Sequence, residues 1–257
     1  MSKIAVIGGG SFGTVVANII ALNGHDVQFW MRSSELVSEV NEIQENKQYL
    51  PGYSLSKKVV ATANMSDAVK KASLIFVAVP SSSFREVVKQ IVVFAPDDAM
   101  LISTTKGIEP GNFKLMSQVL HEESPSSGIG VLSGPNLAKE IASKHPTGTV
   151  IASNNEQIRE TVKDVLRSDT FRVYTNDDMF GIELGGSLKN IYAIIAGLAA
   201  SIGTGHNTNS MLVTRALAEM ARFGRELGAD PMTFLGLAGV GDLVVTCSTP
   251  LSRNYRI

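Results

Sequence analysis

A glycine-rich turn near the start of the chain limits its fold more than any other feature. Gly8, Gly10 and Gly13 match the pattern G-x-G-x-x-G and directly follow the apolar run Ile4–Ile7. The run is rich in β-branched residues, which predicts a buried strand, and the apolar residues after Gly13 have helical spacing. At such a strand-to-helix turn the pattern predicts dinucleotide binding, and a glycine-rich turn that binds nothing is the alternative.

Each glycine of the turn is expected to have its own physical role. Gly8 allows the tight turn, Gly10 lets a pyrophosphate approach the backbone, and Gly13 lets the helix pack closely on the strand. The N-terminus of the helix then offers free N–H groups and the positive end of its dipole to the phosphates.

Composition limits the class of protein. The chain has 257 residues, 44% of them hydrophobic, which suits one large domain or two modest ones. Its net charge of -1 gives no support to a nucleic-acid partner. Cys247 is the single cysteine, which fits a reducing compartment. The first strand leaves no room for a signal peptide, and the run from Ile191 to Ile202 is too short to span a bilayer. We expect a soluble, cytoplasmic protein without membrane insertion.

The end of the second expected strand, Val27–Trp30, bears on the choice of cofactor. NAD-specific folds place an acidic residue there, whereas this chain has Met31-Arg32-Ser33, with Asp26 and Glu35 on either side. Arg32 could face a 2′-phosphate or stack on the adenine, and a solvated arginine is the alternative. We predict NADP or NAD, with a preference for NADP.

Further apolar segments recur at regular intervals with helical patterns between them, which predicts a parallel, doubly wound sheet. Their carboxyl ends are expected along one edge with the glycine turn, where ligands bind. Lys106 follows one of these ends and is expected at the mouth of the cofactor cleft, although a plain loop lysine is the alternative. The expected strands are Val59–Ala61, Leu74–Val79, Met100–Thr104, Ile129–Leu132 and Thr149–Ala152.

After Tyr174 the pattern changes to long helices. The segment Phe180–Ile202 is apolar on most faces, which predicts a buried helix, yet it contains Lys189. A buried lysine needs a partner or a lowered pKa, unless its side chain reaches water from the helix edge. Asp242, in the glycine-rich segment Leu237–Thr246, is its natural counter-charge.

This change of pattern predicts two domains. A dinucleotide-binding domain is expected over 1–175 and a helical substrate and catalytic domain over 176–257. Gly185 and Gly186 lower helix stability, so we expect something large to pack against the backbone there. A second helix is expected over Asn209–Leu227.

Several strings of residues occur in a fixed order: Gly8–Thr14, Tyr49–Gly52, Ser103–Glu109, Ser133–Pro135, Ala138–Glu140, Leu188–Ala193, Gly239–Leu243 and Ser252–Asn254. They resemble the NAD(P)-dependent glycerol-3-phosphate dehydrogenases of the bacterial type, over essentially the whole chain. The resemblance implies an α/β fold, with a Rossmann-like doubly wound sheet domain followed by an all-α substrate domain. It also implies hydride transfer between NAD(P)H and dihydroxyacetone phosphate, a phosphorylated triose, which supplies sn-glycerol 3-phosphate for phospholipid synthesis.

The resemblance further implies roles for individual residues. Lys189 would be the catalytic general acid/base at the C2 oxygen, and Arg253 suits a phosphate through its planar fork. Thr246 is a further candidate for the polar wall of the substrate site. The implied substrate-binding residues are Lys106, Gly134, Asn136, Lys189, Asp242, Ser252, Arg253 and Asn254. The implied cofactor-binding residues are Gly8, Gly10, Ser11, Phe12, Gly13, Arg32, Tyr49, Lys106, Ala138 and Arg253.

Three features depart from the family's pattern. Asn136 stands where the family has a small hydroxyl residue, and Phe12 stands where tryptophan is commoner. The family also continues for several helices beyond Asn254, so we expect the helical domain to be C-terminally short, with exposed apolar surface. The resemblance allows a homodimer. No metal is expected, because the histidines have no metal-ligand spacing.

Two other functions remain open on the sequence alone. A two-domain dehydrogenase of hydroxy acids or sugar acids would share the cofactor domain and a catalytic lysine, but it would not need Arg253 to capture phosphate. A non-catalytic dinucleotide sensor would have no evident use for a buried Lys189.

Overall fold

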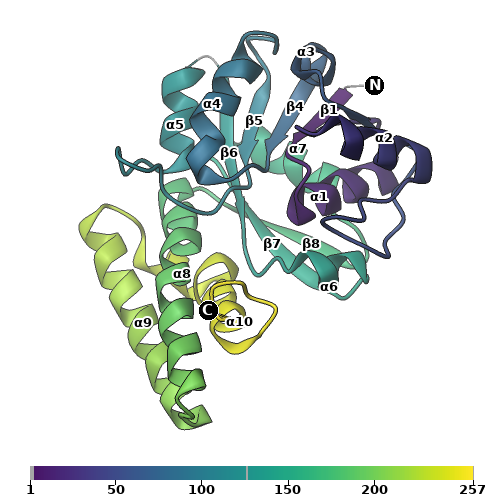
Figure 1. Ribbon diagram of the computed structural model, residues 1–257. Coiled ribbons are helices and arrows are strands. Elements are labelled where there is room, and N and C mark those ends of the chain that lie inside the picture. Colours follow the sequence, from purple (N-terminus) through teal and green to yellow (C-terminus); the bar gives the residue numbers. More distant parts are fainter. Residues whose placement is uncertain (1–2, 126, 257) are drawn as a thin grey trace.

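The computed structural model describes residues 3–125 and 127–256, and within them the chain builds one eight-stranded sheet (Figure 1). The strands are β1 (Lys3–Ile7), β2 (Val27–Trp30), β3 (Val59–Thr62), β4 (Ala72–Val77), β5 (Met100–Ser103), β6 (Gly128–Ser133), β7 (Thr147–Ala152) and β8 (Phe171–Asn176). Their order across the sheet is β3-β2-β1-β4-β5-β6-β7-β8. The order reverses beside β1, and ligands bind at such a reversal in doubly wound sheets.

The sheet differs from the prediction at one edge. Strands β1 to β6 are parallel as expected, but β7 runs antiparallel to β6, with Ser133 opposite Val150. The prediction of an all-parallel sheet was wrong here, because the residues of a strand do not encode its direction. The strand β8, parallel to β7, was not predicted.

Both faces of the sheet are buried, as expected of parallel strands. Along β1, Ile4 and Val6 enter one core cluster, and Ala5 and Ile7 enter another on the opposite face, because alternate side chains of a strand point to opposite sides. The helices that flank the sheet are α1 (Ser11–Leu22), α2 (Ser34–Ile43), α3 (Met65–Val69), α4 (Ser81–Val92), α5 (Met116–Glu123), α6 (Ala138–Ala142) and α7 (Glu156–Leu166).

The helical part begins at α8 (Met179–Ser201) and continues with α9 (His206–Glu226), the short helical turns η1 (Pro231–Leu235) and η2 (Leu237–Gly241), and α10 (Asp242–Ser248). Both long helices were expected. Figure 1 shows α8 leaving the sheet with α9 running alongside it. Phe234 packs in the core between them, and a Cβ on Gly224 would lie 2.3 Å from its ring.

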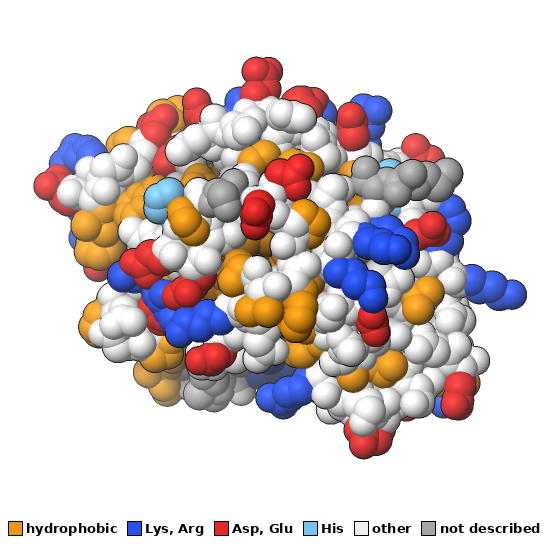
Figure 2. All heavy atoms as spheres, turned by 90° about the horizontal axis from the view of Figure 1, so that it is seen from above, with side chains coloured by type: hydrophobic (Ala, Val, Ile, Leu, Met, Phe, Trp, Pro, Cys, Tyr) orange, Lys and Arg blue, Asp and Glu red, His pale blue; other side chains and the backbone are white. Residues whose placement is uncertain are grey.

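The outer face of α8 carries exposed apolar side chains. Ile191 and Leu198 are 56% and 63% exposed, and Ile202, which directly follows α8, is 74% exposed, so the helical part has the apolar surface that was expected. Figure 2 shows a different face, on which acidic and basic side chains are intermingled. Among the described residues, no helix combines the length and the hydropathy needed to cross a membrane. Ile257, the last residue of the predicted helical domain, lies outside the described residues.

Candidate functional site

The glycine turn between β1 and α1 has the geometry that its pattern requires. Gly8 has φ +124°, and a Cβ there would lie 2.3 Å from the carbonyl oxygen of Ala78. A Cβ on Gly13 would lie 2.0 Å from the carbonyl oxygen of Gly8. Gly10 instead faces open space, with no described atom within 4 Å of its Cβ position. Gly8 and Gly13 therefore serve the fold, whereas Gly10 keeps the approach to the turn clear.

The start of α1 suits an anion placed in that space. Gly10 is the N-cap and has no side chain to cap the helix, and the first turn contains no acidic residue. The N–H groups of a first helical turn have no partners within the helix and lie at the positive end of its dipole. Open space above free donors fits the pyrophosphate of a dinucleotide.

A loop beside the turn is fastened to it by Asn46, which is fully buried. The Asn46 side-chain amide donates to the carbonyl oxygen of Gly9 at 2.9 Å and to Thr14 Oγ1 at 2.8 Å. The Ser11 hydroxyl donates to the carbonyl oxygen of Tyr49 at 2.7 Å, so the Tyr49 loop is held at the turn. Asn46 was not predicted from the sequence, because nothing in a polar segment marks one asparagine as buried.

The end of β2 lies against the same turn. The backbone N–H of Gly8 donates to the carbonyl oxygen of Trp30 at 3.0 Å, and Arg32 follows two residues later with an exposed side chain. Glu35 accepts a hydrogen bond from Ser33 Oγ at 2.5 Å, which lowers the pKa of this carboxyl group. Glu35, the acidic residue nearest to Arg32 along the chain, is thus hydrogen-bonded to Ser33.

A second cluster of predicted residues surrounds a buried carboxylate where the sheet part meets the helical part. Lys189 Nζ donates to Asp242 Oδ1 at 2.5 Å and to Thr246 Oγ1 at 2.6 Å. Lys106 Nζ donates to the other oxygen of Asp242 at 2.5 Å and to the carbonyl oxygen of Gly134 at 2.8 Å. One carboxylate therefore joins two lysines, and Lys189 does not reach into solvent: its side chain is 8% exposed.

The surroundings of Lys189 favour proton transfer. Burial lowers the pKa of its ammonium to about 8, the charge of Lys106 acts in the same direction, and Asp242 opposes them. An amine with a pKa near neutrality can both donate and accept a proton at working pH. Burial raises the pKa of the neighbouring Cys247 to about 11, so this side chain remains a thiol.

Gly185 and Gly186 let α8 approach this place. A Cβ on Gly186 would lie 2.7 Å from Ser133 Oγ at the end of β6, and a Cβ on Gly185 would lie 3.1 Å from the carbonyl oxygen of Ala238 in η2. The glycines thus bring Lys189 toward the carboxyl edge of the sheet and toward the turn that leads into Asp242. Turns of π-helix, such as η2, are frequent at functional sites.

Asn136 lies beside the end of β6. Its side-chain amide donates to Thr149 Oγ1 at 2.9 Å. Its own Oδ1, like Ser133 Oγ, is buried without a hydrogen-bond partner within residues 3–125 and 127–256. Since buried polar atoms are seldom left unpaired, these two oxygens suit a bound polar ligand.

The segment from Ser252 to Asn254 reaches α8. The Asn254 side-chain amide donates to Asn190 Oδ1 at 2.7 Å, one residue after Lys189. Ser252 is buried and Arg253 is exposed. In the part of the chain that the structure describes, no hydrogen bond or ion pair involves the Arg253 side chain.

Phe12 and Ala138, the remaining predicted cofactor residues, are half-buried. Phe12 lies in the first turn of α1, and Ala138 is the first residue of α6. Both pack against the core cluster that includes Val15 and Val16 of α1. Phe12 therefore lies in the same first turn of α1 whose N–H groups have no partners within the helix.

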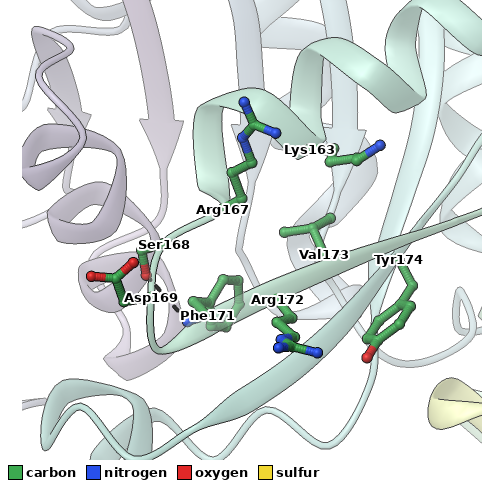
Figure 3. Close-up of a pocket in the computed structure, with 8 residues that line it drawn as sticks. All are labelled: Lys163, Arg167, Ser168, Asp169, Phe171, Arg172, Val173 and Tyr174. Atoms are coloured by element: carbon green, nitrogen blue, oxygen red, sulfur yellow. Dashed lines mark hydrogen bonds between the residues drawn. The ribbon is translucent and has the colours of Figure 1, made fainter.

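A separate pocket of about 470 Å³ lies between α7 and β8 (Figure 3). Figure 3 shows Arg172 and Tyr174 projecting from one side of β8 and Val173 from the other. Lys163 on α7 pairs with Glu160, and Arg167, which directly follows α7, pairs with Asp164. None of the predicted site residues lines this pocket, and the candidate site is the one around Asp242.

Two family models match the chain. One describes the N-terminus of NAD-dependent glycerol-3-phosphate dehydrogenase and matches residues 3–159; the other describes its C-terminus and matches residues 178–257. Among curated proteins, the chain is 55% identical over 253 residues to a glycerol-3-phosphate dehydrogenase (NAD(P)+) of Alcanivorax borkumensis, covering 98% of this chain and 74% of that protein. It is also 55% identical to the Azotobacter vinelandii protein of the same name, covering 99% of this chain and 74% of the relative.

Solved structures of similar proteins lead to the same family as the sequence matches. A glycerol-3-phosphate dehydrogenase from Coxiella burnetii superposes with a TM-score of 0.95 at 37% identity, covering 99% of this chain and 78% of that one. A ketopantoate reductase from Ralstonia eutropha superposes with a TM-score of 0.62 at 16% identity, covering 89% of this chain and 76% of that one, and shares the fold alone. On the matches to both family models and to these relatives, the chain belongs to the NAD-dependent glycerol-3-phosphate dehydrogenase family.

Proposed function

We propose that this chain interconverts dihydroxyacetone phosphate and sn-glycerol 3-phosphate with NAD(P)H, and so supplies glycerol 3-phosphate for phospholipid synthesis. Its relatives are named for this dehydrogenase activity. The observation that carries the proposal for this chain is the buried Lys189, whose ammonium shares the Asp242 carboxylate with Lys106.

Lys189 is the proton carrier in this proposal. In the reducing direction its ammonium donates a proton to the C2 oxygen, and in the oxidising direction the neutral amine accepts that proton. Asp242 and Thr246 hold Nζ in place, and Lys106 stabilises negative charge that develops on the oxygen. A bound nicotinamide supplies or accepts the hydride at C2.

Arg253 binds the substrate phosphate in this proposal, because its planar fork matches phosphate oxygens. Ser252 and Asn254 add hydrogen bonds, and Asn136 Oδ1 offers an unpaired acceptor to a substrate hydroxyl. The hydrogen bond between Asn254 and Asn190 supports this arrangement, because it holds the segment beside Lys189.

The cofactor lies along the glycine turn in this proposal, with its pyrophosphate above Gly10 and its adenosine end near Arg32. The exposed guanidinium of Arg32 favours NADP over NAD. The same proposal divides the chain into a cofactor domain over 1–175 and a substrate domain over 176–257. It also places the protein in the cytoplasm, in keeping with its single, buried cysteine, and allows a homodimer.

Absorbance of the reduced nicotinamide, followed with dihydroxyacetone phosphate and each cofactor, tests the activity. We expect turnover by the wild type and a loss of about 10²–10⁴-fold in kcat for Lys189→Ala, with cofactor affinity nearly unchanged. Lys163→Ala is the control, because this lysine lies on α7 and pairs with Glu160. Unchanged turnover in Lys189→Ala would remove the mechanism. Turnover of a phosphate-free hydroxy acid, without turnover of dihydroxyacetone phosphate, would favour a different dehydrogenase.

A further inference from the structure

A carboxyl group that the proposed chemistry does not use is buried where the helical part meets the sheet part. Glu183, in the second turn of α8, is 3% exposed. Acidic side chains are almost never fully buried unless they are paired, yet among the described residues no lysine or arginine forms a salt bridge with Glu183. Its hydrogen bonds instead come from the start of α5. The backbone N–H of Ser117 lies 3.1 Å from Oε1, and Ser117 Oγ lies 2.5 Å from Oε2.

These contacts make Glu183 the cap of a helix to which it does not belong. Leu115 precedes α5 and has no polar side chain to accept hydrogen bonds from the first turn. The carboxyl group of Glu183 takes that place and receives two donors from Ser117. A carboxylate at a helix N-terminus is favoured by both the free N–H groups and the dipole.

One helical turn further along α8, Ser187 makes a second contact with the same loop. The backbone N–H of Gly107 donates to Ser187 Oγ at 3.2 Å. Residues four apart lie on one face of a helix, so Glu183 and Ser187 point to the loop together. Gly107 opens that loop and Ser117 follows its end, and a bridge between Ile108 and Leu115 closes it.

Lys106 directly precedes the loop that is held in this way, so we call the segment from Gly107 to Met116 the Lys106 loop. Lys106 and Lys189 meet on Asp242, and the charge of Lys106 helps to lower the pKa of Lys189. The distance between the Lys106 and Lys189 ammonium groups therefore depends on how the loop packs against α8.

We propose that Glu183 is a positioning residue. It fixes the Lys106 loop against α8 and so keeps Lys106 and Lys189 within hydrogen-bond distance of the two Asp242 oxygens. The inference rests on the proposed function in one respect, since turnover is one of its two readouts. The other readout is the titration of Lys189 and does not require turnover. The groups that face Lys189 and enter this titration are Lys106, Asp242 and Cys247.

The experiment uses the full chain and compares Glu183→Ala with the conservative Glu183→Gln. In Glu183→Ala the loop loses its anchor, so we expect kcat to fall by up to ~10²-fold, the cost of a 1 Å misplacement. We expect KM for the cofactor to stay unchanged. The pKa of Lys189, followed by NMR of ¹³C-lysine-labelled protein and assigned with Lys189→Arg, should rise as Lys106 moves away. Glu183→Gln should restore both readouts, because its amide oxygen still accepts from Ser117.

The control is Val162→Ala, which removes buried volume from α7 at a fully buried position far along the chain from the loop. It should lower stability while leaving kcat and the Lys189 titration as in the wild type. Equal changes in Val162→Ala and Glu183→Ala would reduce Glu183 to a structural residue and overturn the proposal. So would a Glu183→Ala protein with the wild-type titration of Lys189.

Ser117→Ala tests the same contact from the other side if Glu183→Ala does not fold. It removes only the hydroxyl donor, and it should raise the pKa of Lys189 by a smaller amount. A wild-type titration in a folded Ser117→Ala protein would contradict the proposal. If the wild type itself shows no turnover, the proposed function fails, and the titration still decides the role of Glu183.

Discussion

At the scale of single residues, the pKa of Lys189 sets the sign of the pH dependence. Burial and Lys106 lower it to about 8. Oxidation of glycerol 3-phosphate needs the neutral amine, so its kcat should rise with pH through about 8, and reduction of dihydroxyacetone phosphate, which needs the ammonium, should slow over the same range. Measurements of kcat against pH in each direction test both expectations. Lys106→Met should move the inflection to higher pH, and a profile that is flat in both directions would contradict the assignment.

Arg253 should act on substrate binding. Arg253→Ala loses charge-assisted hydrogen bonds to phosphate, each contributing about 1.5–3 kcal/mol, so KM for dihydroxyacetone phosphate should rise about 10- to 100-fold or more. Steady-state kinetics measure this, with Arg256→Ala as a neighbouring control. A change confined to kcat would show that Arg253 does not hold the phosphate.

Arg32 should discriminate between the two cofactors. Its exposed guanidinium at the end of β2 can pair with the 2′-phosphate that NADPH has and NADH lacks. Arg32→Ala should therefore weaken NADPH binding more than NADH binding, as measured by fluorescence titration, whereas Arg167→Ala should affect neither. Equal losses for the two cofactors would reduce Arg32 to a platform for the adenine.

The residues that the sequence could predict were those whose burial needs an explanation. A lysine in an apolar helix requires a counter-charge, and this requirement pointed to Asp242 before any distance was known. Asn46 and Glu183 could not be found in this way. Each is buried by a partner far along the chain, Gly9 or Ser117, and a polar residue in a local pattern does not reveal a distant partner.

At the scale of elements, the turn between β1 and α1 contains a glycine that the fold requires and another that we propose to serve cofactor binding. A Cβ on Gly13 would overlap the carbonyl oxygen of Gly8, whereas Gly10 faces open space at φ −73°. Gly13→Ala should therefore lower the free energy of unfolding and weaken cofactor binding together. Gly10→Ala should leave the free energy of unfolding nearly unchanged and weaken only the binding of the cofactor. Urea unfolding and cofactor titration measure the two quantities, and a destabilised Gly10→Ala protein would contradict this division.

Elements were predictable where hydrophobic periodicity and turn residues agreed. This held for β1, for α8 and for the glycine turn. It failed at the far edge of the sheet, where β8 alternates buried and exposed residues over only its first four positions. The antiparallel direction of β7 depends on how the chain returns after α6, which no local pattern contains.

At the scale of the whole molecule, Glu183 links stability to pH. Burial raises the pKa of its carboxyl group to about 7, from 4.5 in the unfolded chain, although the donors of Ser117 oppose this. The folded state therefore holds the proton more tightly, and the resulting stability is present below pH 4.5 and is lost as pH rises through about 7. Urea unfolding at pH 5 and pH 8 should show a loss of at most roughly 3 kcal/mol in the wild type. Glu183→Gln should lack this loss of stability. Identical pH dependence of stability in the two proteins would show that Glu183 is not its cause.

The reversal between β6 and β7 has a consequence for how such a molecule can vary. Because β7 starts beside the end of β6, the segment from Gly134 through α6 leaves the sheet and returns to it along the same rim. A change in the length of that excursion would leave the pairing of β6 with β7 in place, but it would also reach the helix that follows the glycine turn, because α6 packs against α1. A fold arranged in this way couples any change beside Asn136 to the opposite side of the same rim.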